Sequence, residues 1–116
     1  MTVMNNLNKI KEKIQYFGNV VADDSKSDRP EQICLTCRSV YGLIVQSLAW
    51  ADSDEAEEIY SSIPIVIEHI DVGLEILAAS DHSNKAEYSD SVSTKRESLV
   101  SIAASRNLED IFEEIA

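Results

Sequence analysis

The sequence predicts an all-α, single-domain protein: an antiparallel four-helix bundle, somewhat elongated. Apolar residues recur at helical spacing in four stretches, and none of these stretches shows the alternation of a strand. Glycine and proline are scarce, with three and two copies in 116 residues, while a hydrophobic fraction of 44% suffices for a core. We expect helices at about 3–22, 29–50, 53–79 and 94–115, with a longer loop at 80–93.

The first expected helix carries its apolar residues at alternating spacings of four and three. They are Val3, Leu7, Ile10, Ile14, Phe17 and Val21. This is the seam of a coiled coil, but three heptads are short for a free coiled coil, so the pattern favours one helix of a bundle. Lys9, Lys11 and Lys13 lie off this seam and are expected to face outward.

The second expected helix begins with a capping signal and continues as one broad apolar stripe. Asp28 can cap the helix, Pro30 falls in the first turn, where it loses no hydrogen bond, and Glu31 follows three residues after the cap. The stripe consists of Ile33, Cys37, Val40, Tyr41, Ile44, Val45 and Leu48.

The third expected helix starts where Asp52 and Glu55 place carboxylates over the positive end of the helix dipole. Its apolar positions keep one phase across Pro64, which predicts a kinked helix rather than two separate ones. They are Ala56, Ile59, Ile63, Val66, Ile67, Ile70, Leu74 and Leu77. A helix over 53–79 is about 40 Å long, which predicts an elongated bundle.

The last expected helix begins at Thr94, which forms a capping box pattern with Glu97. The polar stretch SDHSNKAEYSDS before it is therefore predicted to be a loop. The apolar positions of the helix are Val100, Ala104, Leu108, Ile111 and Ile115. Two glycines, Gly42 and Gly73, fall inside the other helical patterns; either they allow close helix–helix approach, or each is tolerated at about 1 kcal/mol relative to alanine.

One short motif, CLTC, could carry chemistry. Cys34 and Cys37 share a helix face, and with His69 and His82 they supply four potential zinc ligands. A lone CxxC without a second pair is a weak metal signal, and the redox form of the motif sits in a βαβ context that this chain lacks. The favoured interpretation is that Cys37 is a small core residue and that the protein has no metal or other cofactor.

The sequence contains no recognisable catalytic constellation, so we expect no enzymatic activity. There is no Glu-x-x-His, no glycine-rich phosphate loop, no nucleophile elbow and no H-E-x-x-H. A calcium loop starting at Asp52 would need glycine and glutamate where Glu57 and Ile63 stand. No signal peptide or membrane span is predicted, and the expected location is the cytoplasm.

The charge pattern is the most informative feature of the sequence. Ten basic and 21 acidic residues give a net charge of −11, which disfavours nucleic acid and anionic membranes and suits a basic partner. No Lys or Arg occurs from 39 to 84. The predicted binding face consists of Asp52, Asp54, Glu55, Glu57, Glu58, Tyr60, Glu68, Asp71 and Glu75. If exposed beside these acids, Trp50, Tyr60 and Tyr88 would be natural anchors.

Two binding hypotheses follow from this asymmetry. In the first, the acidic face docks on a basic protein and inhibits or regulates it, as immunity proteins, antitoxins and phage-encoded inhibitors do. This is an analogy of composition, since no motif identifies a family. In the alternative, the protein is a homo-oligomeric structural or adaptor bundle, such as a dimer, whose first-helix seam pairs with a second copy. A minor alternative is a zinc- or redox-active protein that uses Cys34 and Cys37.

Overall fold

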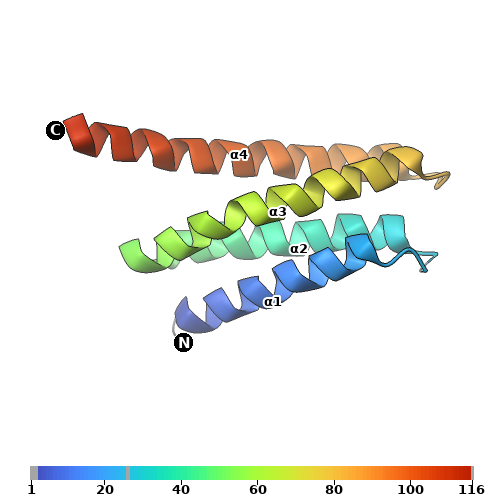
Figure 1. Ribbon diagram of the computed structural model, residues 1–116, viewed down its shortest axis with the longest axis horizontal. Coiled ribbons are helices and arrows are strands. Elements are labelled where there is room, and N and C mark those ends of the chain that lie inside the picture. The colour runs from blue at the N-terminus through green and yellow to red at the C-terminus, as the bar shows by residue number, and fades with distance from the viewer. Residues whose placement is uncertain (1–2, 26, 116) are drawn as a thin grey trace.

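The computed structural model describes residues 3–25 and 27–115, and the side chains of residues 7–106 within them. Its helices are α1 (Val3–Ala22), α2 (Arg29–Trp50), α3 (Ser53–Ala79) and α4 (Lys85–Ile115), and no described residue lies in a strand. Consecutive helices run in opposite directions (Figure 1), so the predicted antiparallel four-helix bundle is confirmed. Its extents of 52 × 31 × 18 Å agree with the predicted elongated shape.

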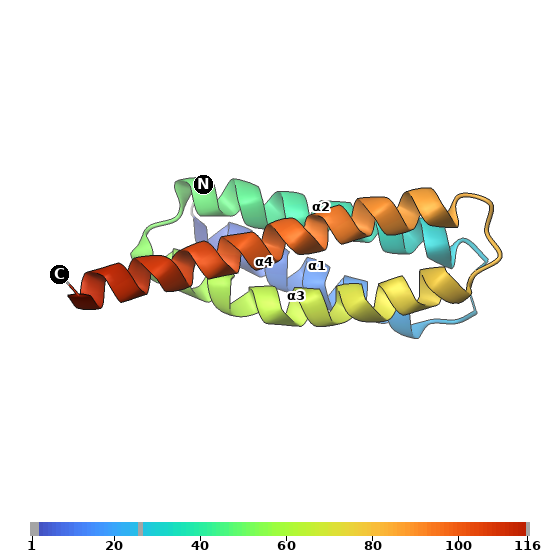
Figure 2. The same ribbon diagram turned by 90° about the horizontal axis from the view of Figure 1, so that it is seen from above.

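The helices are arranged differently from a simple up-and-down ring, in which the first and last helices would be neighbours. Here α1 packs on α2 and α3, α4 packs on the same two helices, and the described parts of α1 and α4 do not touch. Two antiparallel hairpins, α1–α2 and α3–α4, therefore stack with α1 along α3 and α2 along α4 (Figure 2). The remaining contact, between α2 and α3, crosses the centre of the bundle.

One glycine makes this central contact possible. A β-carbon at Gly73 in α3 would lie 3.0 Å from the Cγ2 atom of Ile33 in α2, so a larger residue there would require Ile33 to shift by a few tenths of an ångström. The close-approach interpretation of Gly73 is thus confirmed. Gly42 differs, because a β-carbon there would meet nothing within 4 Å.

The apolar seam of α1 is buried inside the bundle. Its described members Leu7, Ile10, Ile14, Phe17 and Val21 are all core residues, whereas the side chain of Val3 lies outside the described residues. In this fold the seam is covered by the chain itself. The self-association hypothesis required this seam to pair with a second copy. Because the seam is buried, it is not available for that contact.

Two details of the predicted α2 are wrong. The Asp28 side chain makes no capping bond; instead it accepts a hydrogen bond of 3.4 Å from Gln32 Nε2. Pro30 does occupy the first turn, and it is buried. Val45, assigned to the core stripe, is 40% exposed, because the core side of α2 is centred on Val40 and Ile44.

By length and composition, α2 is the one described helix that could cross a membrane. This finding differs from the prediction that the sequence contains no candidate membrane span. Core helices of water-soluble proteins meet the same criterion. The core side of α2 carries Ile33, Val40 and Ile44, each fully buried in the bundle, and 39% of the apolar 18-residue window is buried.

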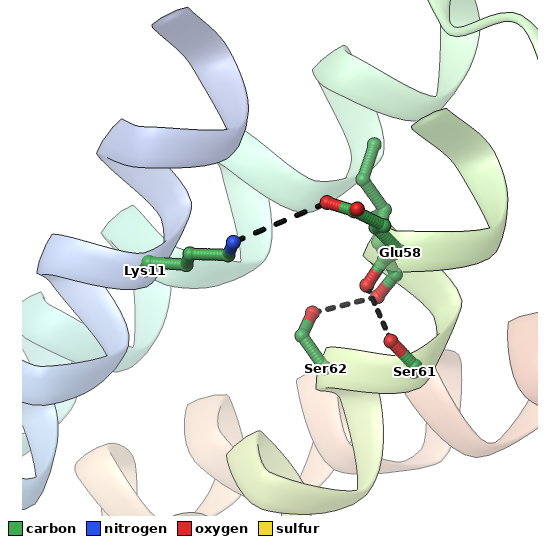
Figure 3. Close-up of polar contacts among 5 residues, drawn as sticks. Lys11, Glu58, Ser61 and Ser62 are labelled. Atoms are coloured by element: carbon green, nitrogen blue, oxygen red, sulfur yellow. Dashed lines mark hydrogen bonds and ion pairs between the residues drawn. The ribbon is translucent and has the colours of Figure 1, made fainter. Parts of the chain in front are cut away.

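α3 runs unbroken through Pro64, as the continuous apolar phase predicted, and its ribbon curves along its length (Figure 2). Proline has no N–H to donate to the preceding turn. In that turn, the hydroxyl of Ser61 donates to the carbonyl of Glu58 at 2.8 Å, and Ser62 donates to Ile59 at 2.6 Å (Figure 3). The carbonyl that loses its usual N–H donor is that of Tyr60, four residues before Pro64, so the two serine hydroxyls add second donors to the neighbouring carbonyls of Glu58 and Ile59.

The start of the last helix is the main error of the sequence analysis. α4 begins at Lys85, so the connection spans only 80–84 instead of the predicted loop 80–93. Thr94 is inside the helix, where its hydroxyl donates to the carbonyl of Asp90 at 2.8 Å and caps nothing.

The buried face of α4 also differs from the predicted one. Val92 and Leu99 are buried in the core, while Val100 is 42% exposed. Ala104, which the sequence analysis also assigned to the apolar face, is exposed as well. The side chains of Leu108, Ile111 and Ile115 lie outside the described residues.

Candidate binding surface

The residues predicted to form one acidic face separate into groups with different roles. Asp52 and Glu55 form a reciprocal capping box at the start of α3. The Asp52 carboxylate accepts from the Glu55 N–H at 2.9 Å, and the Glu55 carboxylate accepts from the Asp52 N–H at 3.0 Å. These two carboxylates stabilise the helix start by satisfying backbone donors that have no partner within the helix.

Two further acids are paired with arginines of α4. Asp71 accepts a hydrogen bond from Arg96 Nε at 2.6 Å, and this bond raises the pKa of the Arg96 guanidinium. Glu57 forms an ion pair with Arg106. The side of α3 that faces α4 is therefore locally neutralised. Neither pair was predicted from the sequence, because the arginines lie 25 and 49 residues further along the chain.

Glu58 lies on the opposite side of α3, toward α1. Its carboxylate is 4.0 Å from the ammonium of Lys11 (Figure 3), and both side chains line an open groove. The groove has a volume of about 530 Å³. It is lined by Lys11, Ile14, Gln15, Glu58, Ser61, Ser62 and Ile65. Both ends of this ion pair are well exposed, so it contributes little to stability.

The remaining acids, Asp54, Glu68 and Glu75, are exposed and have no ion pair among the described side chains. Glu68 and Glu75 belong to a stripe along the outer face of α3, which we call the α3 outer stripe. Its members follow each other at spacings of three and four: Glu58, Ser61, Ile65, Glu68, Val72, Glu75 and Ala79. All seven are exposed.

The two large apolar members of this stripe were missed by the sequence analysis. Ile65 is 47% exposed and Val72 is 40% exposed, one heptad apart. The signal was present in the spacing, since neither residue falls on the core phase of Ile63 and Ile70. Exposed aliphatic side chains interleaved with unpaired carboxylates are suited to an amphipathic basic partner.

Of the three aromatic residues considered as anchors, only Trp50 is fully available. Trp50 ends α2 and is 79% exposed. Tyr60 is half-buried, with the Arg106 guanidinium 5.5 Å above its ring. Tyr88 is also half-buried and packs against His82 with 5.3 Å between ring centroids.

The cysteines are core residues. Cys34 and Cys37 are both buried, and burial raises the pKa of the Cys37 thiol to about 12. The thiolate is the form that acts as nucleophile and zinc ligand, so burial of Cys37 disfavours both roles. Within the described residues, no three His, Cys, Asp or Glu side chains are grouped as metal ligands would be.

The chain was compared with models of protein families, with functionally characterised proteins and with solved structures, and no significant match was found.

Proposed function

We propose that this protein is a small helical binding module that docks on a basic protein partner through the α3 outer stripe and so inhibits or regulates it. The observation that carries the proposal is the pairing of Ile65 and Val72, both exposed, with the unpaired carboxylates of Glu68 and Glu75. Apolar residues supply contact area, and the carboxylates select a basic partner and speed its approach.

The rest of the molecule supports this choice of surface. The acids of α3 that face α4 are occupied by Arg96 and Arg106, so the unpaired negative charge of the helix lies on its outer side. The overall charge of −11 would steer a cationic partner toward the protein from a distance of about a Debye length. A partner covered at a surface that it uses to bind nucleic acid would be inhibited.

A defined probe can test this surface before the natural partner is known. We suggest a synthetic amphipathic helix with leucine on one face and lysine on its flanks, measured by isothermal titration calorimetry at low and moderate salt. We expect Ile65→Ser and Val72→Ser each to weaken binding about fivefold to tenfold, because each loses roughly 1 kcal/mol of apolar burial. Val100→Ser is the matched control, since Val100 is equally exposed but lies on α4.

The contribution of the carboxylates needs a control variant with the same change in net charge. Glu68→Gln with Glu75→Gln should weaken binding, whereas Glu87→Gln with Glu97→Gln, on exposed positions of α4, should weaken it much less. Equal effects of the two charge pairs, or of the serine variants and Val100→Ser, would mean that the peptide senses only net charge. The proposal would then be rejected.

A further inference from the structure

The outward face of α2 is a second exposed surface, and its C-terminal half carries no charge. Its positions are also spaced by three and four residues: Leu35, Arg38, Gly42, Val45 and Ala49, followed by Asp52 after the helix ends. All six are exposed. No residue between Arg38 and Asp52 is charged, in a chain of which 27% is charged. We call these six residues the α2 outer stripe.

The centre of this stripe has the geometry of a socket for another helix. Gly42, Val45, Gln46 and Ala49 are all exposed and occupy positions i, i+3, i+4 and i+7. These are the four positions that receive one side chain of a facing helix in knobs-into-holes packing. The space outside Gly42 is open, because a β-carbon there would meet nothing within 4 Å. Small residues on either side of Val45 allow two helix backbones to approach closely.

The charges at the two ends of the stripe are complementary to each other. Arg38 lies seven residues before Val45, and Asp52 lies seven residues after it. If two copies of α2 cross antiparallel with Val45 on the two-fold axis, Arg38 of each copy lies level with Asp52 of the other, which follows the extended residue Ala51 and whose carboxylate also caps α3. A parallel crossing would instead bring like charges together. Arg38 has no ion pair among the described side chains of its own chain.

We infer that the protein forms a two-fold dimer in which the α2 outer stripes of two copies pack antiparallel about Val45. Two molecules of net charge −11 repel each other, and an uncharged face is where they can meet at the lowest electrostatic cost. The contact is confined to one face of a single helix about 33 Å long, so the interface is small. The dimer should therefore depend on protein concentration. It does not depend on the α3 outer stripe.

A disulfide at the axis tests the geometry. Val45→Cys should cross-link two copies under mild oxidation, because only a residue on the two-fold axis meets its own counterpart within disulfide reach. Val100→Cys, equally exposed on α4, should remain mostly monomeric on a non-reducing gel. Cys34 and Cys37 are buried and do not compete. Equal cross-linking of the two variants would overturn the proposed axis.

Sedimentation velocity over about 1 µM to 500 µM tests the association itself. We expect wild type to pass from monomer to dimer, Val45→Glu to stay monomeric, and Arg38→Glu to raise the dissociation constant at least tenfold. Ile65→Glu, on the α3 outer stripe, should dimerise like wild type. A wild type that is monomeric throughout, or a dimer lost in Ile65→Glu and kept in Val45→Glu, would overturn the inference. Because Val45→Glu should still bind the basic peptide, the two proposals can fail separately.

Discussion

The imidazole of His69 in α3 lies directly against Gly18 in α1: a β-carbon at position 18 would be 3.1 Å from His69 Nε2. The ring is held in place by an edge-to-face contact with the buried Phe17, with 5.9 Å between ring centroids. The two parallel helices α1 and α3 therefore approach each other through a ring that sits over a glycine. No local pattern in either helix would have indicated this contact.

We expect the stability effect of Gly18→Ala to depend on His69. Alanine is favoured over glycine in a helix by about 1 kcal/mol, but here the added methyl group displaces the ring. In wild type, the change should therefore give no gain, whereas in a His69→Ala background it should stabilise by about 1 kcal/mol. Urea denaturation of the four proteins measures this coupling. The same gain in both backgrounds would contradict the contact.

Two other helical glycines should respond to alanine in opposite directions. Gly42→Ala adds a methyl group to open space and should raise the free energy of unfolding by about 0.5–1 kcal/mol. Gly73→Ala crowds the side chain of Ile33 in the packed core and should lower it by about 1–3 kcal/mol. Both are measured by chemical denaturation at low protein concentration, where monomer dominates. A stabilised Gly73→Ala variant would argue against the central α2–α3 contact.

The helix starts give a test in which the structure and the sequence disagree. Asp52→Ala should cost about 1 kcal/mol, because it removes one half of the capping box. The sequence pattern predicts a similar loss for Asp28→Ala, whereas the structure, with no capping bond at Asp28, predicts a much smaller one. Thermal and urea unfolding of both variants would show which of the two expectations for Asp28→Ala is correct. Equal losses would favour the sequence pattern.

The difference between Asp52, which caps its helix, and Asp28, which does not, shows that local sequence patterns predict some structural features and not others. The first three helices were predicted at their observed bounds because their apolar residues recur often enough to fix both phase and length. The N-terminal part of α4 was missed because, between Lys85 and Ser93, the only apolar residues larger than alanine are Tyr88 and Val92. Packing of these two residues against the core holds a helix that the local sequence marks only weakly.

The candidate binding surface could likewise be predicted from the sequence only in part. The positions of the α3 acids along the helix followed from the sequence, and so did their spacing. Which of them remain unpaired depends on Arg96 and Arg106, and so on where α4 lies relative to α3. The exposure of Ile65, Val72 and Val45 likewise depends on which side of each helix the other three cover. Both the ion pairs and the exposed apolar residues therefore depend on the order of the helices in space. The spacing of apolar residues along the sequence carries no information about that order.

The contact between α2 and α4 includes one side-chain hydrogen bond that can be tested alone. The hydroxyl groups of Tyr41 and Ser98 are 2.8 Å apart, in a partly buried position. Tyr41→Phe should lower the free energy of unfolding by about 1 kcal/mol, and Ser98→Ala by a similar amount. In the double variant, the losses should not add, because the bond is lost only once. Fully additive losses would mean that the two hydroxyls do not interact.

The buried thiol of Cys37 predicts a specific loss of stability at alkaline pH. Burial raises its pKa from an ordinary value of 9.0 to about 12, with the charge of Lys95 lowering it in part. Below pH 9 the thiol is protonated in both the folded and the unfolded chain, so its contribution to stability is fully present.

Above pH 9 the unfolded chain releases the Cys37 proton while the folded chain retains it. The free energy of unfolding should therefore fall by about 1.4 kcal/mol per pH unit as the pH rises toward 12. Lysines and tyrosines titrate in the same range, so the relevant quantity is the difference from Cys37→Ala, which lacks this slope. Urea denaturation at pH 8, 9, 10 and 11 measures it. Parallel pH profiles for the two proteins would show that Cys37 ionises freely in the folded state and would contradict its place in the core.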